Sequence, residues 1–323
     1  MAGTTVGAVV FLILVGAVVR MTGSGMGCPD WPTCFGQWIP PTDISQLPPD
    51  YKIKFAVAGK EIADFDAFKT WVEYINRLLG VLIGLFSLGT LALSIPLRKT
   101  RPGVFGFSLA GFLAVLVVGG VGAYVVRSDL QEGVVTIHMV LALGALSLFI
   151  LGLIESYRDR LLLPAEWKNQ MNPLNRWLAW GSTALIAAQV VMGTQVREEI
   201  DRLAKSMGES TRDQWIDLLP TLYDVHSLFY YVLVAGLIFL GWRLKTLLSN
   251  WRPLSVIYIS LWTVIAGEVL LGLGMHHLGI PAWMQPAHLL LATTLFGLSL
   301  AFSQVLNLGT KPVQREALLE ETW

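Results

Sequence analysis

The chain alternates between long apolar segments and shorter polar connections. Each apolar segment runs for about 20 residues, the length that a helix needs to cross the hydrocarbon core of a bilayer. Their continuous apolar character favours helices over the alternating strands of a membrane barrel. The sequence therefore predicts an all-α polytopic membrane protein with eight transmembrane helices. These segments are 4–22, 72–96, 103–126, 134–154, 174–196, 220–242, 253–275 and 283–306.

The first segment, 4–22, also resembles a signal peptide in length. No basic region precedes it, and no pattern of small residues typical of a cleavage site follows at a suitable place. We therefore expect it to be a retained helix.

Composition agrees with lipid as the solvent. Of 323 residues, 54% are hydrophobic and only 14% are charged, and the mean hydropathy is +0.59. A soluble domain carries roughly a quarter charged residues. The formal net charge is zero, which argues against a nucleic-acid partner.

The distribution of Lys and Arg predicts the orientation of the helices. The connections 97–102, 155–176 and 243–252 hold ten such residues within 38, whereas the opposite connections hold nine within 89. The denser set is expected on the cytoplasmic side. Both termini then lie on the cytoplasmic side of a cell inner membrane. The loop 21–71 and the starts of the even-numbered helices lie at the outer face.

Chemically distinctive residues recur at a fixed spacing. His138 follows Asn76 by 62 residues, His288 follows His226 by 62, and the two pairs are offset by 150. Glycines in the third and seventh segments share this offset. The chain thus predicts two tandem four-helix bundles, in residues 1–160 and 161–323, related by a pseudo-twofold axis along the membrane normal. His226 then faces His288 in the second bundle, and His138 faces Asn76 in the first.

Paired histidines on facing helices are suited to holding a haem iron, since each supplies one neutral imidazole and the bundle excludes water. A buried histidine is alternatively a packing residue or a proton-relay group. The repeated spacing at matched depth favours iron ligation by His226 and His288. The adjacent His276 and His277 end the seventh segment and are expected at the membrane interface.

Three glycines gather in the third segment, at Gly119, Gly120 and Gly122. Small residues let helices approach closely. They also leave room for a flat macrocycle. We favour close packing.

A polar helical face distinguishes the first bundle. Glu73, Asn76 and Arg77 occupy positions i, i+3 and i+4 at the start of the second segment, where strongly polar groups indicate a functional site. The residues that stand 150 positions later, in the second half, are Tyr223, His226 and Ser227. We therefore expect the first half to transfer protons beside an iron that has an open or exchangeable coordination position. We expect the second half to hold a haem tightly.

Several arginines lie near the outer ends of helices and are candidates for pairing with haem propionates. Extension of the side chain to the membrane interface explains each of them equally well. They are Arg20, Arg77, Arg127 and Arg197.

Two cysteines, Cys28 and Cys34, stand six residues apart in the loop 21–71. Prolines between them favour a turned backbone, and an outer location permits a disulfide. Free thiols are expected instead if the topology is inverted. Trp31 and Trp38 suit the membrane interface.

These features together resemble the haem A synthase family over the whole chain. The resemblance rests on the run Gly16–Pro32, which contains TGSGMGCPDWP, on Glu73–Arg77, and on the histidines that head the fourth, sixth and eighth segments. It implies an eight-helix pseudo-twofold fold. It also implies oxidation of the C8 methyl of haem O to a formyl group, giving haem A in two successive hydroxylations.

The resemblance assigns roles to individual residues. It implies a haem b between His226 and His288, and a substrate haem in the N-terminal half anchored by His138. Glu73 matches the family glutamate and would accept a proton or stabilise positive charge at the methyl carbon. Cys28 and Cys34 match the family's loop cysteines.

One position departs from the family pattern, Glu-x-x-His-Arg, because this chain has Asn76 in place of the histidine. Asparagine hydrogen-bonds but is a poor iron ligand. The residue is either an engineered substitution that disables the site or a natural variant that works with a five-coordinate substrate haem. We favour the first, because Glu73 and Arg77 are intact.

Two other functions fit part of the pattern. A dihaem membrane cytochrome that takes electrons from a quinol uses the histidines but gives Glu73 no role, and a non-catalytic haem carrier tolerates Asn76. The chain has no flavin or nicotinamide signature. Expected partners are haem O, an unidentified electron donor, haem O synthase and terminal-oxidase assembly factors, and the sequence is compatible with a homo-oligomer.

Overall fold

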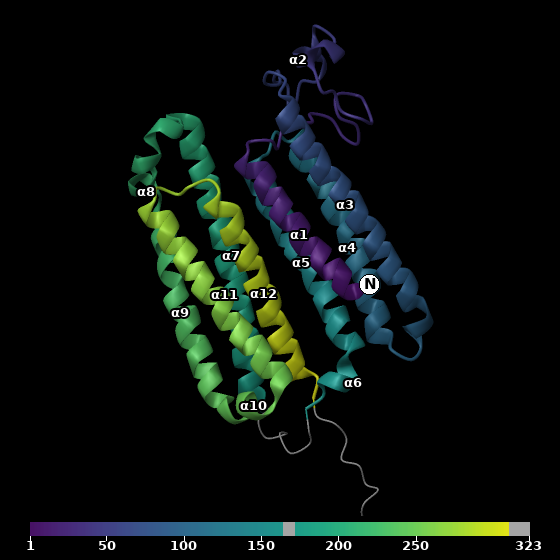
Figure 1. Ribbon diagram of the computed structural model, residues 1–323, viewed down its shortest axis with the longest axis vertical. Helices are drawn as coiled ribbons and strands as arrows, with labels where there is room; N and C mark the ends of the chain where they lie inside the picture. The colour runs from purple at the N-terminus through teal and green to yellow at the C-terminus, as the bar shows by residue number, and fades with distance from the viewer. Residues whose placement is uncertain (164–171, 310–323) are drawn as a thin grey trace, which may run out of the picture.

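The computed structural model describes residues 1–163 and 172–309 (Figure 1). Regular structure in these residues is helical, with two isolated bridges, Cys34–Gln37 and Val57–Lys60. The long helices are α1 (Ala2–Met21), α3 (Ala67–Ser94), α4 (Pro102–Arg127), α5 (Glu132–Ser156), α7 (Pro173–Met207), α9 (Thr221–Arg243), α11 (Arg252–His277) and α12 (Met284–Asn307). The short ones are η1 (Ile44–Gln46), α2 (Tyr51–Lys54), η2 (Ile95–Arg98), α6 (Arg158–Leu161), η4 (Glu209–Gln214), α8 (Trp215–Leu218) and α10 (Lys245–Asn250).

Local signals explain where the long helices begin. The side chain of Asp66 accepts a hydrogen bond from the Lys69 N–H at the start of α3, 3.1 Å away. Asn172 does the same for Asn175 at the start of α7, 2.9 Å away, and Pro173 follows it directly. Such caps satisfy amide groups that the first helical turn leaves without partners.

The helices form two groups that lie side by side (Figure 1). In the first group α1 packs on α3 and α5, and α4 packs on α3 and α5. In the second α7 packs on α9 and α12, and α11 packs on α12. The groups meet where α12 contacts α1 and α5 and where α5 contacts α7. Figure 1 places α2 and α8 at one end of the molecule and α6 and α10 at the other, so the connections alternate between two sides as predicted.

Among the described residues, seven helices are long and apolar enough to cross a membrane: α1, α3 continued by η2, α4, α5, α9, α11 and α12. Large apolar side chains such as Leu85, Leu116, Ile259 and Leu270 are exposed on them, as expected for surfaces that face lipid. The chain is therefore an integral membrane protein.

The predicted segment 174–196 lies in α7 but does not reach the same apolarity, so eight spans remain a prediction. The helix is 35 residues long, or about 50 Å, and exceeds a hydrocarbon core of about 30 Å. Its polar Thr183 is buried and lies 2.8 Å from Ser299 Oγ and 2.9 Å from Ser303 Oγ of α12. These contacts pair the hydroxyl of Thr183 with α12 inside the helix packing.

Ion pairs connect the two groups where α1 approaches α7. Arg20, near the end of α1, donates from Nε to Asp201 Oδ2 of α7 at 2.7 Å, and Arg197 contacts the other oxygen of Asp201 at 2.8 Å. Nearby, Thr136 of α5 donates to the buried Glu198 at 2.6 Å. The two groups thus share a polar contact as well as an apolar interface.

A small domain without long helices precedes α3 and sits at one end of the first group. Its core consists of the disulfide, Phe35, Leu47 and Tyr51. The Tyr51 hydroxyl accepts a hydrogen bond from the Phe65 N–H at 3.0 Å. These contacts agree with a folded cap over this end of the bundle.

Candidate functional site

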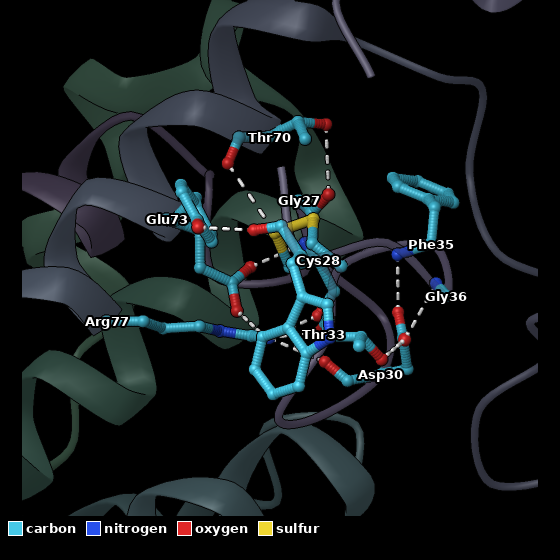
Figure 2. The surroundings of a disulfide bond; sticks show 12 residues. Gly27, Cys28, Asp30, Thr33, Phe35, Gly36, Thr70, Glu73 and Arg77 are labelled. Carbon is cyan, nitrogen blue, oxygen red and sulfur yellow. Dashed lines mark hydrogen bonds and ion pairs between the residues drawn. A yellow bond between two sulfur atoms is a disulfide. The ribbon is translucent and has the colours of Figure 1, made fainter. Parts of the chain in front are cut away.

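The polar face at the start of α3 binds the preceding loop, as Figure 2 shows. Glu73 is only 3% exposed. One of its carboxylate oxygens lies 2.5 Å from Arg77 Nη2, and the other accepts the Cys28 N–H at 2.8 Å. A buried carboxylate needs such donors, because burial without them is costly. The loop therefore supplies part of the environment of Glu73.

Arg77 holds the same loop through backbone carbonyls. Its guanidinium donates to the carbonyls of Cys28 and Asp30, each at 2.5 Å, and of Thr33 at 3.0 Å. The planar fork of an arginine is suited to several acceptors at once. These contacts bind Arg77 to the loop, and its pairing with a haem propionate stays a prediction.

The loop itself is shaped by a disulfide and an aspartate. Cys28 and Cys34 are joined, with their Cα atoms 4.8 Å apart, which agrees with the predicted bridge. Asp30 accepts the N–H groups of Phe35 at 2.6 Å and Gly36 at 2.9 Å, and also the Thr33 hydroxyl. These contacts close the turn that presents its carbonyls to Arg77.

Gly27 brings the loop against α3. A Cβ atom at this position would lie 2.3 Å from the Lys69 carbonyl oxygen, so no larger residue fits without movement of the backbone. The Gly27 carbonyl accepts the Thr70 hydroxyl at 3.0 Å. The glycine permits the close approach that lets Cys28 reach Glu73.

Asn76 and His138 are the predicted partners in the first group. Asn76 Oδ1 is buried and has no hydrogen-bond partner among the described residues. His138 lies against Gly122 of α4, where an added Cβ would be 3.2 Å from the ring. Gly122 thus leaves space for the histidine, and Asn76 presents a buried acceptor without a donor among the described residues.

The close-packing interpretation is wrong for Gly119 and Gly120. Both are exposed, and a Cβ on either would meet nothing within 4 Å. Among residues 1–163 and 172–309, no atom lies close enough to pack against either glycine. Of the three glycines, only Gly122 makes a close contact of this kind.

The paired histidines of the second group lie together. The ring centres of His226 and His288 are 6.4 Å apart, with planes at 83°. Two imidazole nitrogens bound to one metal at about 2 Å, each about 1 Å from its ring centre, place the centres about 6 Å apart. The spacing therefore fits a shared haem iron.

Two neighbours of these histidines were not predicted. Gly193 of α7 lies beside His226, since a Cβ there would be 3.2 Å from the ring. Glu268 of α11 places Oε2 2.6 Å from His288 Nδ1. An acid inside an apolar segment was a signal for Glu268. The signal for Gly193 was the spacing Gly-x-x-x-Arg, shared by Gly16–Arg20 and Gly193–Arg197.

The remaining candidates lie outside these two pairs. Arg20 binds Asp201, and Arg127 is exposed at the end of α4. His276 Nδ1 lies 2.8 Å from the Tyr223 hydroxyl, and its ring contacts that of His277. Tyr223 thus pairs with the end of α11, and it stands 150 residues after Glu73 in the sequence.

Comparison with known proteins adds to this geometry. Residues 1–300 match the COX15-CtaA family, described as cytochrome oxidase assembly protein. The chain is 26% identical to "Heme A synthase" of Paramagnetospirillum magneticum over 328 residues, covering 90% of this chain and 88% of the relative. It is 26% identical to "Heme A synthase" of Shewanella oneidensis over 208 residues, with 64% and 59% covered.

A third relative, "Heme A synthase" of Dinoroseobacter shibae, is 31% identical over 211 residues, with 59% of this chain and 52% of the relative covered. In the last two comparisons the chain spans little more than half the length of the relative. The family match instead extends from α1 into α12 and includes the polar face of α3 and every histidine described above. The protein is therefore a member of the COX15-CtaA family of cytochrome oxidase assembly proteins.

Proposed function

We propose that the protein is a haem A synthase, which oxidises the C8 methyl of haem O to a formyl group for use in terminal oxidases. Two hydroxylations, each a two-electron oxidation that adds one oxygen atom and requires dioxygen together with an electron donor, convert the methyl group first to an alcohol and then to a geminal diol, which loses water to give the formyl group. The observation that carries the proposal is the spacing of His226 and His288, 6.4 Å between ring centres, in a chain of this family.

The C-terminal half, residues 161–323, holds a haem b in this proposal. His226 and His288 provide the ligands from α9 and α12. When bound, such a haem supplies one-electron transfer. Gly193 leaves space for the His226 ring, and the Gln189 side chain donates to the His226 carbonyl at 2.8 Å, so α7 positions this part of α9.

The N-terminal half, residues 1–160, receives haem O as substrate. His138 anchors the iron and Glu73 is the catalytic carboxylate, placed to accept a proton or stabilise positive charge near the methyl carbon. Arg77 positions Glu73 and the loop, and Arg20 and Arg127 remain candidates for the propionates. Because Asn76 is a poor iron ligand, we infer that this form of the protein has impaired activity.

The proposal includes the finer architecture. The two halves are four-helix bundles related by a pseudo-twofold axis, with α7 as the eighth span. They lie in a cell inner membrane with both termini on the cytoplasmic side and the disulfide loop outside. The reaction requires haem O and an electron donor, haem O synthase and terminal-oxidase assembly factors are expected partners, and a homo-oligomer is compatible with it.

Restoring the missing ligand tests the function. The chain and its Asn76→His variant are expressed with haem O, and the extracted haems are separated by chromatography and identified by mass spectrometry. We expect the variant to produce more formyl haem than the unmodified chain. Asn76→Gln, which restores length without an imidazole, is the control and should not gain activity.

A dihaem cytochrome gives a different outcome in the same experiment. It would bind two redox-active haems and oxidise a quinol, but Asn76→His would yield no formyl haem. That result would overturn the proposed synthase.

A further inference from the structure

An acidic side chain lies inside the span formed by α11. Glu268 is in the apolar stretch of Arg252–His277, and its side chain is 13% exposed. Ionisable groups within membrane spans are costly and are retained where they have a partner and a task. Glu73 has the loop as its partner. Iron ligation by His226 and His288 does not itself require a glutamate, so the role of Glu268 needs an explanation.

Glu268 is directed at one of these histidines. Its Oε2 lies 2.6 Å from His288 Nδ1, across the contact between α11 and α12. Its other oxygen, Oε1, is buried and has no hydrogen-bond partner among the described residues. The carboxylate thus makes its close polar contact with His288.

The equivalent position in the first half is different. At the offset of 150, Glu268 corresponds to Val118 of α4, and His288 corresponds to His138. The His138 ring interacts with the backbone of Val118. The same pair of helix positions therefore places a carboxylate beside His288 and a neutral peptide group beside His138.

We propose that Glu268 is a positioning residue that orients His288 and sets the electronic character of its ring. The 2.6 Å approach of Oε2 lets the carboxylate accept the Nδ1–H once the ring turns to align it, which fixes the tautomer in which Nε2 is free for iron. A carboxylate acceptor raises the basicity of a ligating imidazole, which favours ferric over ferrous iron and lowers the midpoint potential. The inference rests on the proposed haem site between His226 and His288.

A purely structural role predicts other behaviour. A glutamate that only neutralises a polar neighbour stabilises the helix pair, and its replacement changes stability without changing the potential of a haem that stays bound. The midpoint potential of the low-spin haem therefore separates the two roles.

The test uses the purified full-length protein with its haem. Glu268→Gln keeps the shape and an acceptor oxygen but removes the charge. We expect it to retain the low-spin spectrum and to show a higher midpoint potential in a spectroelectrochemical titration. Glu268→Ala removes the acceptor, and we expect haem affinity to fall by about 10- to 100-fold. Glu268→Asp, which keeps the charge, should remain closer to the unmodified potential than Glu268→Gln.

Thr263→Val is the matched control, because Thr263 is exposed on the same helix and bonds only to the Ile259 carbonyl within it. It should leave both measurements unchanged. An unchanged potential in Glu268→Gln together with unchanged haem affinity in Glu268→Ala would overturn the inference. Loss of the low-spin haem in His226→Ala and His288→Ala shows that the haem site itself stands, and its retention in both shows that the proposed site has failed instead.

Discussion

The two halves of the molecule treat the same helix position in opposite ways. At the start of α3, Glu73 and Arg77 are bound to a disulfide-closed loop that precedes the helix. At the start of α9, Tyr223 contacts His276 at the end of α11, and His226 lies beside His288. The first half thus joins its polar residues to a segment outside the bundle. The second keeps its polar contacts between helices.

Under the proposed function, this difference explains how one scaffold holds two kinds of haem. A resident haem needs two ligands whose positions are set by packed helices, as in the second half. A substrate haem must enter and leave, so the polar groups around it need support that does not occupy both iron positions. We propose that the loop, which contacts Glu73 and Arg77, provides that support in the first half.

Removing either histidine of the second half should have the largest effect. His226→Ala or His288→Ala leaves one ligand of the pair, and we expect complete loss of the low-spin haem spectrum from that half. His276→Ala is the matched control, since this histidine lies at the helix end and pairs with Tyr223. Absorption spectroscopy of the purified proteins measures the result, and an unaltered spectrum in either ligand variant would place the haem elsewhere.

Breaking the loop contact should destabilise the first half strongly. Arg77→Ala leaves Glu73 buried without its ion-pair partner, and loss of one member of a buried pair costs about 3–5 kcal/mol. Thermal unfolding and protease sensitivity of the loop report the change. Arg202→Ala, in an exposed pair with Glu199 and Glu132, should change neither. Equal behaviour of the two variants would contradict a structural role for Arg77.

Opening the disulfide should have a smaller effect on the same loop. Replacing Cys28 and Cys34 by Ser releases a seven-residue loop, for which chain entropy predicts a loss of about 2 kcal/mol. In the unmodified protein a thiol reagent should label neither cysteine until a reductant is added. Immediate labelling would show that the bridge is absent, and the thermal midpoint of the double variant then should not fall.

The smallest effect is expected at the position equivalent to Glu73. Tyr223→Phe removes the hydroxyl that contacts His276 at 2.8 Å, and one such hydrogen bond contributes about 1 kcal/mol. A small decrease in thermal stability with an unchanged haem spectrum is the expected outcome. A spectral change as large as that of His226→Ala would mean that the two halves differ less than proposed.

Much of this arrangement was predictable because it depends on pattern. Long apolar runs predict the helices, and the repeated 62-residue spacing predicts that His226 and His288 meet. Segment 174–196 was harder, because the partners of its buried Thr183 lie on α12, far along the chain. The roles of single residues were the hardest to predict. Gly193 beside His226 and Glu268 beside His288 can be interpreted only once the neighbouring helix is in place.

The role of Arg77 illustrates the same limit. Its position on the polar face suggested a propionate partner, which stays a prediction, whereas its contacts with the carbonyls of Cys28, Asp30 and Thr33 were not predicted. Sequence patterns do not show where backbone carbonyls of an irregular loop point. The glycines of α4 failed for a related reason, since a small residue indicates available space without telling whether a neighbour fills it.

The order of these contacts along the chain has a consequence for biogenesis. The groups that bind Glu73 and Arg77 come from Cys28, Asp30 and Thr33, all more than 40 residues earlier in the chain. A ribosome therefore completes the loop before it synthesises α3. When α3 enters the membrane, the donors and acceptors that make its charged residues tolerable already exist on the same polypeptide, so the helix can insert without waiting for the second half to be made.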